Sequence, residues 1–427
     1  MASVVVIGAG VVGLCCAYAL RKRGMDVVVV ERATPGSGAS HGNGGYICPS
    51  FSGPVPAPGV RVDAWRWLSR PGGPLSITPR ADLYFARWLL DFWRHCTPRS
   101  YQRGLEAIAR LNASTMTLYD AMAADGVRFE MRQQGLLFLC RTEEAARGLT
   151  NDLEAMTRYG FATPRRLEPA ELRDEAPGIR SEVVAGVLAP GERHVRPESL
   201  IAGLERRLND LGVPVHSGTE VCGFECREGR VTALHTTNGR MEASHVVLAA
   251  GVWSSHLSAM LGTRLPLEAG KGYSVTMAAS GTFPRRPVYF AEAHVGLAPY
   301  NGALRVLGMM DVCGLDERLT RRRLEALKAA PSRYVRDWRI GPIEEEWAGL
   351  RPMTPDGLPM IGYAAGLANV VIAAGHAMLG VTLGPATGEA VVGLIDGKPD
   401  AALLAPFRPG RFGDARIDAT HRGGRAR

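Results

Sequence analysis

The sequence of 427 residues has no uninterrupted apolar run of about 18 residues, the length that a membrane-spanning helix requires. It also lacks the basic stretch that opens a secretory signal peptide. We therefore expect no transmembrane helix, and peripheral contact with a membrane surface stays open. The chain is expected in the cytoplasm, with the inner face of the membrane as the alternative.

The sequence lacks zinc-like cysteine pairs and lacks aromatic-rich basic clusters, and these absences argue against a zinc-binding protein and a nucleic-acid-binding protein. The eight cysteines are scattered, and none forms a C-x-x-C set with zinc-like spacing. This favours a reducing compartment and predicts no metal site. No Lys/Arg cluster is interleaved with aromatic residues, so we expect no nucleic-acid partner. The formal net charge of +8 fits either a solvated Arg-rich surface or an affinity for anions. Residues 415–427 form a basic tail that we expect to be disordered.

The first 31 residues carry the most informative pattern. An apolar strand over residues 4–7 runs into Gly8-Ala9-Gly10-Val11-Val12-Gly13, which fits G-x-G-x-x-G. A helix is predicted from Leu14 to Arg23, and a second strand over residues 27–30 ends at Glu31. Gly8 permits the tight turn, Gly10 lets a pyrophosphate approach, and Gly13 allows close packing of helix and strand. This order predicts a dinucleotide site in which Glu31 binds ribose hydroxyls, and it disfavours NADP. A Gly-rich turn in an ordinary βαβ unit is the alternative.

A second unit of the same kind lies near the C-terminus. An apolar strand over residues 369–374 is followed by a Gly-containing turn at 375–382 and a helix from Leu383 to Asp396. That helix would point its N-terminus at a ligand. A cofactor that spans the fold needs motifs at both ends of the chain, whereas a nicotinamide does not. The second unit therefore favours FAD over NAD.

The remaining segments predict a second domain. Strand-like runs between residues 265 and 327 indicate an antiparallel sheet, residues 102–126 read as one helix, and residues 129–140 as a β-ribbon around Gly135. We expect an FAD-binding domain of residues 1–50, 194–262 and 340–427, and a substrate domain of residues 51–193 and 263–339. The expected fold class is α/β: a Rossmann-like FAD-binding domain with an α+β substrate domain built on the antiparallel sheet.

Several segments together resemble the D-amino-acid oxidase superfamily of flavoproteins, which includes glycine oxidase and sarcosine oxidase. They are the N-terminal motif with Glu31, the loop at 40–45, Ala249-Ala250-Gly251-Val252-Trp253-Ser254, Trp347-Ala348-Gly349-Leu350-Arg351-Pro352, Thr354-Pro355-Asp356-Gly357-Leu358-Pro359 and the segment Gly375 to Gly380. Asn43-Gly44-Gly45, Ala57-Pro58-Gly59-Val60 and Lys271-Gly272-Tyr273-Ser274 look like the branch that contains the small subunit of D-amino-acid dehydrogenase.

The resemblance implies a set of FAD contacts and three catalytic residues. Non-covalent FAD would contact Gly8, Gly10, Val12, Gly13, Glu31, Arg32, Ser40, Asn43, Gly44, Gly45, Val221, Ala250, Gly251, Trp253, His376, Leu379, Gly380, Val381 and Thr382. Arg351 would bind the substrate carboxylate, unless it forms a structural salt bridge with Glu344 to Glu346. Tyr273 would assist through its hydroxyl, unless it is a core residue. His376 would stabilise reduced flavin or cap the helix.

The implied reaction is oxidative deamination of a D-amino acid. Hydride transfer from Cα to the flavin gives an imino acid, which water converts to a 2-oxo acid and ammonia. The alternatives are oxidation of a secondary amino acid such as sarcosine, proline or hydroxyproline, and a non-catalytic flavin subunit of a larger dehydrogenase. The electron acceptor is oxygen, a quinone or another protein, and a homo-oligomer stays open.

Overall fold

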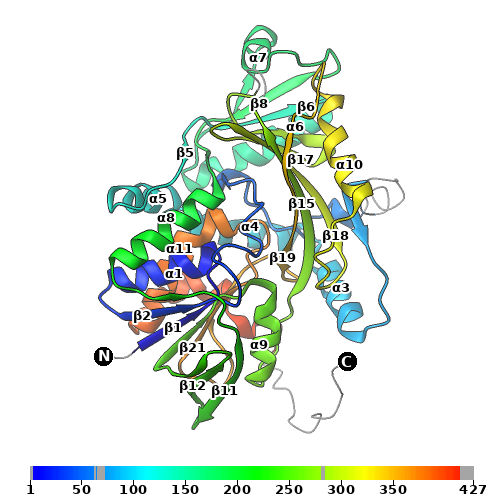
Figure 1. Ribbon diagram of the computed structural model, residues 1–427. Coiled ribbons are helices and arrows are strands. Elements are labelled where there is room, and N and C mark those ends of the chain that lie inside the picture. Colours follow the sequence, from blue (N-terminus) through cyan, green and yellow to red (C-terminus); the bar gives the residue numbers. More distant parts are fainter. Residues whose placement is uncertain (1–2, 62–63, 65–72, 280–283, 414–427) are drawn as a thin grey trace.

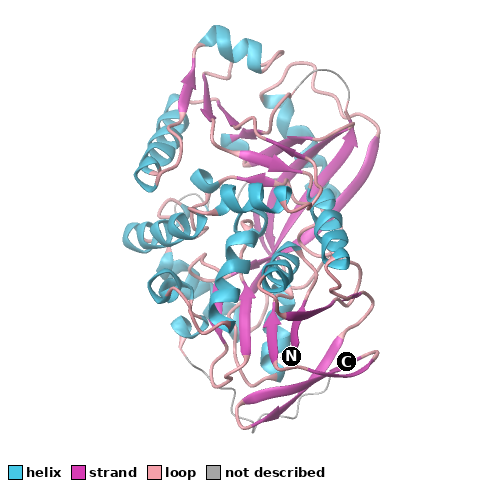
Figure 2. Cartoon of the chain, turned by 90° about the vertical axis from the view of Figure 1, so that its left-hand side faces the viewer, coloured by secondary structure: helices cyan, strands magenta, loops and turns pink. Residues whose placement is uncertain are grey.

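The computed structural model describes residues 3–61, 64, 73–279 and 284–413. Its core consists of two large β-sheets, each with its own layer of helices (Figure 1). In Figure 2 the long strands of the larger sheet fill most of the upper half, and the small sheet β11-β12-β13 lies at the lower end. The predicted disordered tail at 415–427 lies outside the described residues.

The first sheet is mostly parallel and has the strand order β10-β2-β1-β14-β21-β20. Its strands are β1 (Ser3–Ile7), β2 (Asp26–Val30), β10 (Val215–His216), β14 (His245–Leu248), β20 (Met360–Tyr363) and β21 (Val370–Ala374). Only the edge strand β20 pairs antiparallel. The strands are rich in β-branched residues because both faces of this sheet are covered. The Rossmann-like part of the prediction is confirmed.

Helices and a small sheet cover the two faces of this parallel sheet. One face packs against α1 (Val11–Lys22), α8 (Pro197–Asp210) and α11 (Gly380–Ile395). The other face packs against α9 (Ser254–Met260) and the antiparallel strands β11 (Val221–Arg227), β12 (Arg230–Thr236) and β13 (Gly239–Glu242). Helix α1 begins at Val11, earlier than predicted, because Gly10 is already its N-cap. Helices α1 and α11 lie side by side in Figure 1.

The second sheet is the larger one and is mostly antiparallel. It runs in the order β19-β15-β18-β17-β16-β6-β8-β7, with β4 beside β18. Its strands are β4 (Leu75–Ile77), β6 (Leu136–Cys140), β7 (Arg165–Leu167), β8 (Ala185–Ala189), β15 (Glu268–Ala278), β16 (Val288–Phe290), β17 (Val295–Pro299), β18 (Ala303–Val312) and β19 (Ile343–Met353). Two pairs, β16 with β6 and β18 with β4, are parallel. The predicted antiparallel sheet is confirmed.

Strand β19 bears on the predicted domain boundary. The division at residue 340 gave this segment to the FAD-binding domain, but its backbone pairs with β15 along nearly the whole strand. It therefore belongs to the large sheet, although the motifs that follow it return to the parallel sheet. The division of the chain into domains stays a prediction.

Two further predictions about local structure are wrong. The single helix expected over 102–126 is two helices, α4 (Pro98–Asn112) and α5 (Thr115–Ala124). The Thr115 hydroxyl donates to Asn112 Oδ1 at 3.1 Å at the break and lies 3.2 Å from the Thr382 carbonyl oxygen of α11. The expected ribbon at 129–140 does not form, because β5 (Met131–Arg132) pairs with β9 (Arg193–Val195) and β6 pairs with β8.

The remaining elements complete the outer layers. The other helices are α3 (Leu83–His95), α6 (Glu143–Ala155), α7 (Pro169–Glu175), α10 (Arg321–Ala329) and α12 (Ala401–Leu404), and β3 (Tyr46–Ile47) pairs with β9. Helix α10 packs on one face of the large sheet, where Leu324 and Leu327 join the core around Tyr273. The opposite face of the large sheet turns toward the loop that follows β2.

Candidate active site

A cleft of about 590 Å³ opens at the carboxyl ends of β1, β2, β14 and β21, where a parallel α/β sheet binds its ligand. Fourteen of the predicted FAD contacts line it: Gly8, Gly10, Val12, Glu31, Arg32, Ser40, Asn43, Val221, Ala250, Gly251, Trp253, His376, Gly380 and Val381. They come from both ends of the chain and from its middle. The structure therefore brings these residues together at one cleft, and their contact with the cofactor stays a prediction.

Glycines shape the first turn of the cleft. Gly8 has φ +105°, and a Cβ there would stand 2.6 Å from the carbonyl oxygen of Ala249. A Cβ on Gly13 would lie 1.9 Å from the Gly8 carbonyl oxygen. Gly13 therefore serves the close packing of helix and strand that the motif predicts, and it is not among the residues that line the cleft.

Two helix N-termini open onto the cleft. The first residues of α1 and of α11 both line it. The Val11 N–H donates to Ser40 Oγ at 3.0 Å, while Leu379, the N-cap of α11, makes no side-chain cap bond. The remaining first-turn N–H groups have no partner within their helix. With the positive dipole ends they suit an anionic group such as a pyrophosphate.

One end of the cleft carries the predicted ribose-binding acid. The Glu31 carboxylate accepts hydrogen bonds from the backbone N–H groups of Ala9 at 2.8 Å and Ala33 at 3.0 Å. These bonds fix the carboxylate and leave lone pairs for ribose hydroxyls. Beside it the Arg32 guanidinium lies 3.9 Å from the centroid of the Trp253 ring. The residues of this cleft fit FAD.

Four further predicted contacts are not among the lining residues: Gly44, Gly45, Leu379 and Thr382. The Thr382 hydroxyl donates to the Tyr46 carbonyl at 3.0 Å and lies 3.3 Å from the Cys48 N–H, so it joins α11 to β3 and its following turn. A Cβ on Gly45, which has φ +66°, would stand 1.7 Å from the Val195 carbonyl oxygen. For these residues a direct contact with the cofactor stays a prediction.

Arg351 lies on β19, next to the cleft residues Leu350 and Pro352. Its Nη1 donates to the Met309 carbonyl at 2.8 Å, and its guanidinium lies over Gly272, where a Cβ would be 2.1 Å from Nη2. Within the described ranges the guanidinium has no carboxylate partner. Burial lowers the pKa of Arg351 to about 10, so it stays charged at neutral pH. A charged donor of this kind can bind a carboxylate.

The alternative of a structural salt bridge to the preceding glutamates is not supported. Glu345 Oε1 lies 2.8 Å from His41 Nε2, and Glu346 Oε1 lies 2.9 Å from Lys328 Nζ. Neither glutamate is paired with Arg351, and Glu344 is exposed. The charge of Arg351 is therefore available to a ligand.

Tyr273 does not occupy the position predicted for it. Neighbouring residues of a strand point to opposite faces, and Gly272 faces Arg351. Tyr273 is 1% exposed on the other face, where its hydroxyl donates to Asp311 Oδ2 at 2.8 Å and lies 3.2 Å from Thr320 Oγ1. The prediction that it assists the carboxylate clamp is corrected: Tyr273 is a core residue under α10.

His376 lines the cleft and is 3% exposed. Its Nε2 lies 2.9 Å from the Thr387 hydroxyl of α11. Burial lowers the pKa of His376 to about 3, so the imidazole is neutral at physiological pH. The alternative role as a helix cap is wrong, because the N-cap of α11 is Leu379. A contact of His376 with the flavin stays a prediction.

Tyr289 was missed by the sequence analysis. It lies on β16, where its ring centroid is 5.2 Å from that of Phe51 and 5.9 Å from that of Phe138. Burial raises the pKa of the Tyr289 phenol to about 12, and the positive charge of Arg351 opposes this rise. Tyr289 packs in the cluster with Tyr46 and Phe138, whereas Tyr273 belongs to the core under α10. The sequence of this strand contains no motif, so only strand pairing reveals the residue.

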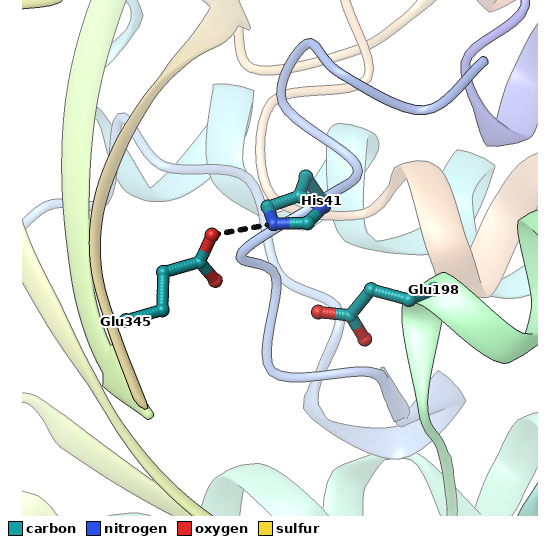
Figure 3. Close-up of side chains that lie close together, drawn as sticks. All are labelled: His41, Glu198 and Glu345. Carbon is teal, nitrogen blue, oxygen red and sulfur yellow. Dashed lines mark hydrogen bonds and ion pairs between the residues drawn. The ribbon is translucent and has the colours of Figure 1, made fainter. Parts of the chain in front are cut away.

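Figure 3 shows a polar cluster formed by His41, Glu198 and Glu345. His41, Glu198 and Glu345 each offer one potential ligand atom, and these atoms lie within 4.8 Å of one another. However, Glu198 also accepts from Arg305, and its Oε2 lies 3.8 Å from Arg196 Nε. A divalent cation would enter a site that already has two guanidinium groups. We interpret the cluster as an ion-pair network, and the absence of a metal site stays a prediction.

Comparison with known proteins identifies the family. The family model described as FAD dependent oxidoreductase matches residues 3–394. The chain belongs to this family. The FAD-binding character of the cleft follows from this membership and fits the residues that line it.

Relatives of similar length support the assignment. The chain is 30% identical over 402 residues to a D-amino acid dehydrogenase of Granulibacter bethesdensis, covering 92% of this chain and 96% of the relative. It is 33% identical over 408 residues to a D-amino acid dehydrogenase of Cereibacter sphaeroides, covering 92% of each. The glycine oxidase structure from Geobacillus kaustophilus shares the fold, with a TM-score of 0.76 and 24% identity over 96% of this chain and 99% of that one. In the part of the chain that the structure describes, no helix is both long and apolar enough to cross a membrane.

Proposed function

We propose that this flavoenzyme oxidises a D-amino acid to a 2-oxo acid and ammonia, as a dehydrogenase. The observation that carries the proposal is the guanidinium of Arg351 beside the FAD cleft, which has no carboxylate partner among the described residues. Full-length relatives named D-amino acid dehydrogenase support the choice of substrate. When bound, FAD supplies the acceptor of two electrons.

Arg351 would bind the substrate through its carboxylate. Nη1 is held by the Met309 carbonyl, which fixes the plane of the guanidinium. Nε and Nη2 have no hydrogen-bond acceptor among the described residues, so they are the donors that a carboxylate can use in a bidentate pair. The missing side chain of Gly272 leaves the space in which the guanidinium lies. This arrangement orients the substrate before reaction.

Hydride transfer requires a substrate amine that is neutral when it reacts. The positive charge of Arg351 disfavours the protonated amine, and His376, held neutral by burial, does not contribute to this effect. The cofactor is proposed to be non-covalent, because the His41 side chain is engaged with Glu345 and is not among the residues that line the cleft. The electron acceptor is left to the assay below.

The test is a dye-coupled assay of the purified yellow holoenzyme against matched D-, L- and N-methyl amino acids, with and without oxygen. We expect turnover of D-amino acids and release of ammonia in equal amount to the 2-oxo acid. Preference for L-enantiomers or N-substituted substrates would overturn the substrate assignment. Bound FAD with no turnover of any amino acid would instead favour a non-catalytic flavin subunit.

A further inference from the structure

The loop from Ser37 to Gly45 has one side on the cleft and the other on the large sheet. Ser37, Ser40 and Asn43 line the cleft. The carbonyl groups of His41, Asn43 and Gly44 accept hydrogen bonds from residues of the large sheet and the turn beside it. The conformation of the loop on its cofactor side therefore depends on what binds these carbonyls.

Arg305 of β18 is the main donor to the loop. It is 1% exposed. Its Nη1 donates to the Asn43 carbonyl at 2.8 Å and to the His41 carbonyl at 3.3 Å, and its Nε donates to Thr276 Oγ1 at 2.9 Å. Its Nη2 donates to the Glu198 carboxylate at the start of α8. A buried guanidinium is tolerated only when its donors are paired, and here the loop supplies two of the four acceptors.

Tyr300 completes the attachment. It is 3% exposed, and its hydroxyl donates to the Gly44 carbonyl at 3.0 Å. The Arg305 guanidinium lies 5.3 Å from the centroid of the Tyr300 ring. The two side chains thus bind the carbonyl groups of three residues of the loop, His41, Asn43 and Gly44.

The outer part of the loop is held against β19. His41 Nε2 lies 2.8 Å from Glu345 Oε1, the contact that Figure 3 marks with a dashed line. A Cβ on Gly42 would lie 2.1 Å from the Trp347 ring, so the loop backbone lies directly on that ring. The loop has little freedom to move away from the sheet.

We propose that Arg305 is a positioning residue for FAD, which acts by fixing the loop from Ser37 to Gly45 in its cofactor-binding conformation. The same strand β18 provides the Met309 carbonyl that holds Arg351. One strand therefore positions both the cofactor loop and the substrate clamp. The inference needs FAD binding by the family and is independent of the proposed substrate.

The test compares Arg305→Met with Arg323→Met in the full chain. Arg323 is a matched control: it is 7% exposed on the other face of the large sheet, pairs with Asp311 at 2.6 Å and donates to the carbonyls of Gly73 and Pro74. The measurement is the rate of FAD release from diluted holoenzyme, followed by flavin fluorescence, together with thermal unfolding of each variant.

We expect Arg305→Met to accelerate FAD release by about tenfold or more, since it removes charge-assisted hydrogen bonds to the loop. Arg323→Met should destabilise the fold by a similar amount and leave the release rate within about threefold of the original. Equal release rates in the two variants would reduce Arg305 to a structural role and overturn the proposal.

Two less disruptive substitutions test the proposal if Arg305→Met does not fold. Tyr300→Phe removes only the hydroxyl that binds the loop, and Tyr334→Phe removes a buried hydroxyl bound to Glu292 at 2.8 Å. Only Tyr300→Phe should release FAD faster than the unmodified chain. The release rate of Arg305→Lys should lie between those of Arg305→Met and the unmodified chain. An unchanged release rate in Tyr300→Phe and Arg305→Lys would contradict the proposal. Absence of amino-acid turnover would leave this test intact, because it measures flavin release.

Discussion

At the scale of single residues, three arginines in or against the large sheet differ in what pairs with them. Arg305 is paired with Glu198 and Arg323 with Asp311. Arg351 has no carboxylate partner among the described residues, although it carries the same charge. A buried or partly buried cation without a partner is costly. The cost is offset if the partner is the substrate, and this is what makes Arg351 the informative residue of the site.

Arg351→Met should raise KM for the D-amino acid by about 100-fold, the equivalent of about 3 kcal/mol for a bidentate charge-assisted pair. FAD content should not change, because Arg351 is not among the residues that line the cleft. The measurements are steady-state kinetics and the ratio of flavin to protein absorbance. Arg318→Met, which removes an arginine with an 87% exposed side chain, is the control for lost charge. An unchanged KM would exclude the clamp.

Gly272→Ala should impair the same clamp from the opposite strand. Its new Cβ would stand 2.1 Å from Arg351 Nη2, so the guanidinium must move. We expect KM to rise at least tenfold with FAD retained, because a shift of about 1 Å in a positioned group costs up to 100-fold. Gly223→Ala, also in a strand, meets its nearest atom only at 3.7 Å and should leave KM unaffected. Equal KM values in the two variants would show that the space over Gly272 is not needed.

At the scale of elements, local patterns were predictable and pairing was not. The β1–α1–β2 unit and the β21–α11 unit follow from contiguous residues, because strand, Gly turn and helix are each local. The alternation of side chains between the two faces of a strand is also local. Which of the two faces meets the cofactor depends on the elements that pack against the sheet. Tyr273 was therefore assigned to the wrong side of β15, and Tyr289, which has no motif around it, was not found.

The buried network around Arg305 illustrates the same limit. Its acceptors lie at residues 41, 43, 198 and 276, which no sequence spacing connects. The prediction of a ribbon at 129–140 is wrong for a related reason. Each of its two strands pairs with a strand far along the chain instead of with the other. Composition and periodicity indicate which residues are buried, whereas the pairing of strands and side chains depends on the whole fold.

Close packing of α1 and α11 gives a prediction at this scale. A Cβ on Gly388 would lie 2.7 Å from the Cys15 carbonyl oxygen. Gly388→Ala should therefore lower the free energy of unfolding by about 1–3 kcal/mol and accelerate FAD release, since both helices open onto the cleft. Gly148→Ala in α6 meets no atom within 4 Å and should stabilise by up to about 1 kcal/mol. Urea unfolding measures both effects, and a stabilised Gly388→Ala would refute the packing argument.

At the scale of the whole molecule, buried titratable groups set opposing pH trends. Burial lowers the pKa of His194 to about 4 and of His376 to about 3, so acidification below about 6.5 protonates the unfolded chain first and destabilises the fold. Glu192 behaves in the opposite way. It is 4% exposed, its Oε2 has no hydrogen-bond partner among the residues that the structure describes, and burial raises its pKa from 4.5 to about 7.

Glu192→Gln should change the pH dependence of stability in a defined direction. Between pH 4.5 and about 7 the folded state retains a proton on Glu192 that the unfolded chain releases. The free energy of unfolding therefore falls as pH rises through this window, by about 3 kcal/mol from this group. Glu192→Gln lacks this loss. In urea unfolding, its free energy of unfolding relative to the unmodified chain should show no gain at pH 4 and the greatest gain at pH 8. Parallel curves would contradict this, and Glu242→Gln, with an 81% exposed side chain, is the control.

The strand order of the parallel sheet also governs when this protein can acquire its cofactor. Val5 of β1 pairs with Val28 on one side and with Val246 on the other, and Val246 in turn pairs with Val370. During synthesis, strand β14 acquires its second neighbour only after β21 has been made. Such long-range pairing makes folding slow. The cleft is accordingly complete only after residues 373–381 have been synthesised, because Ala373, His376 and Val381 line it together with Gly8 and Gly10.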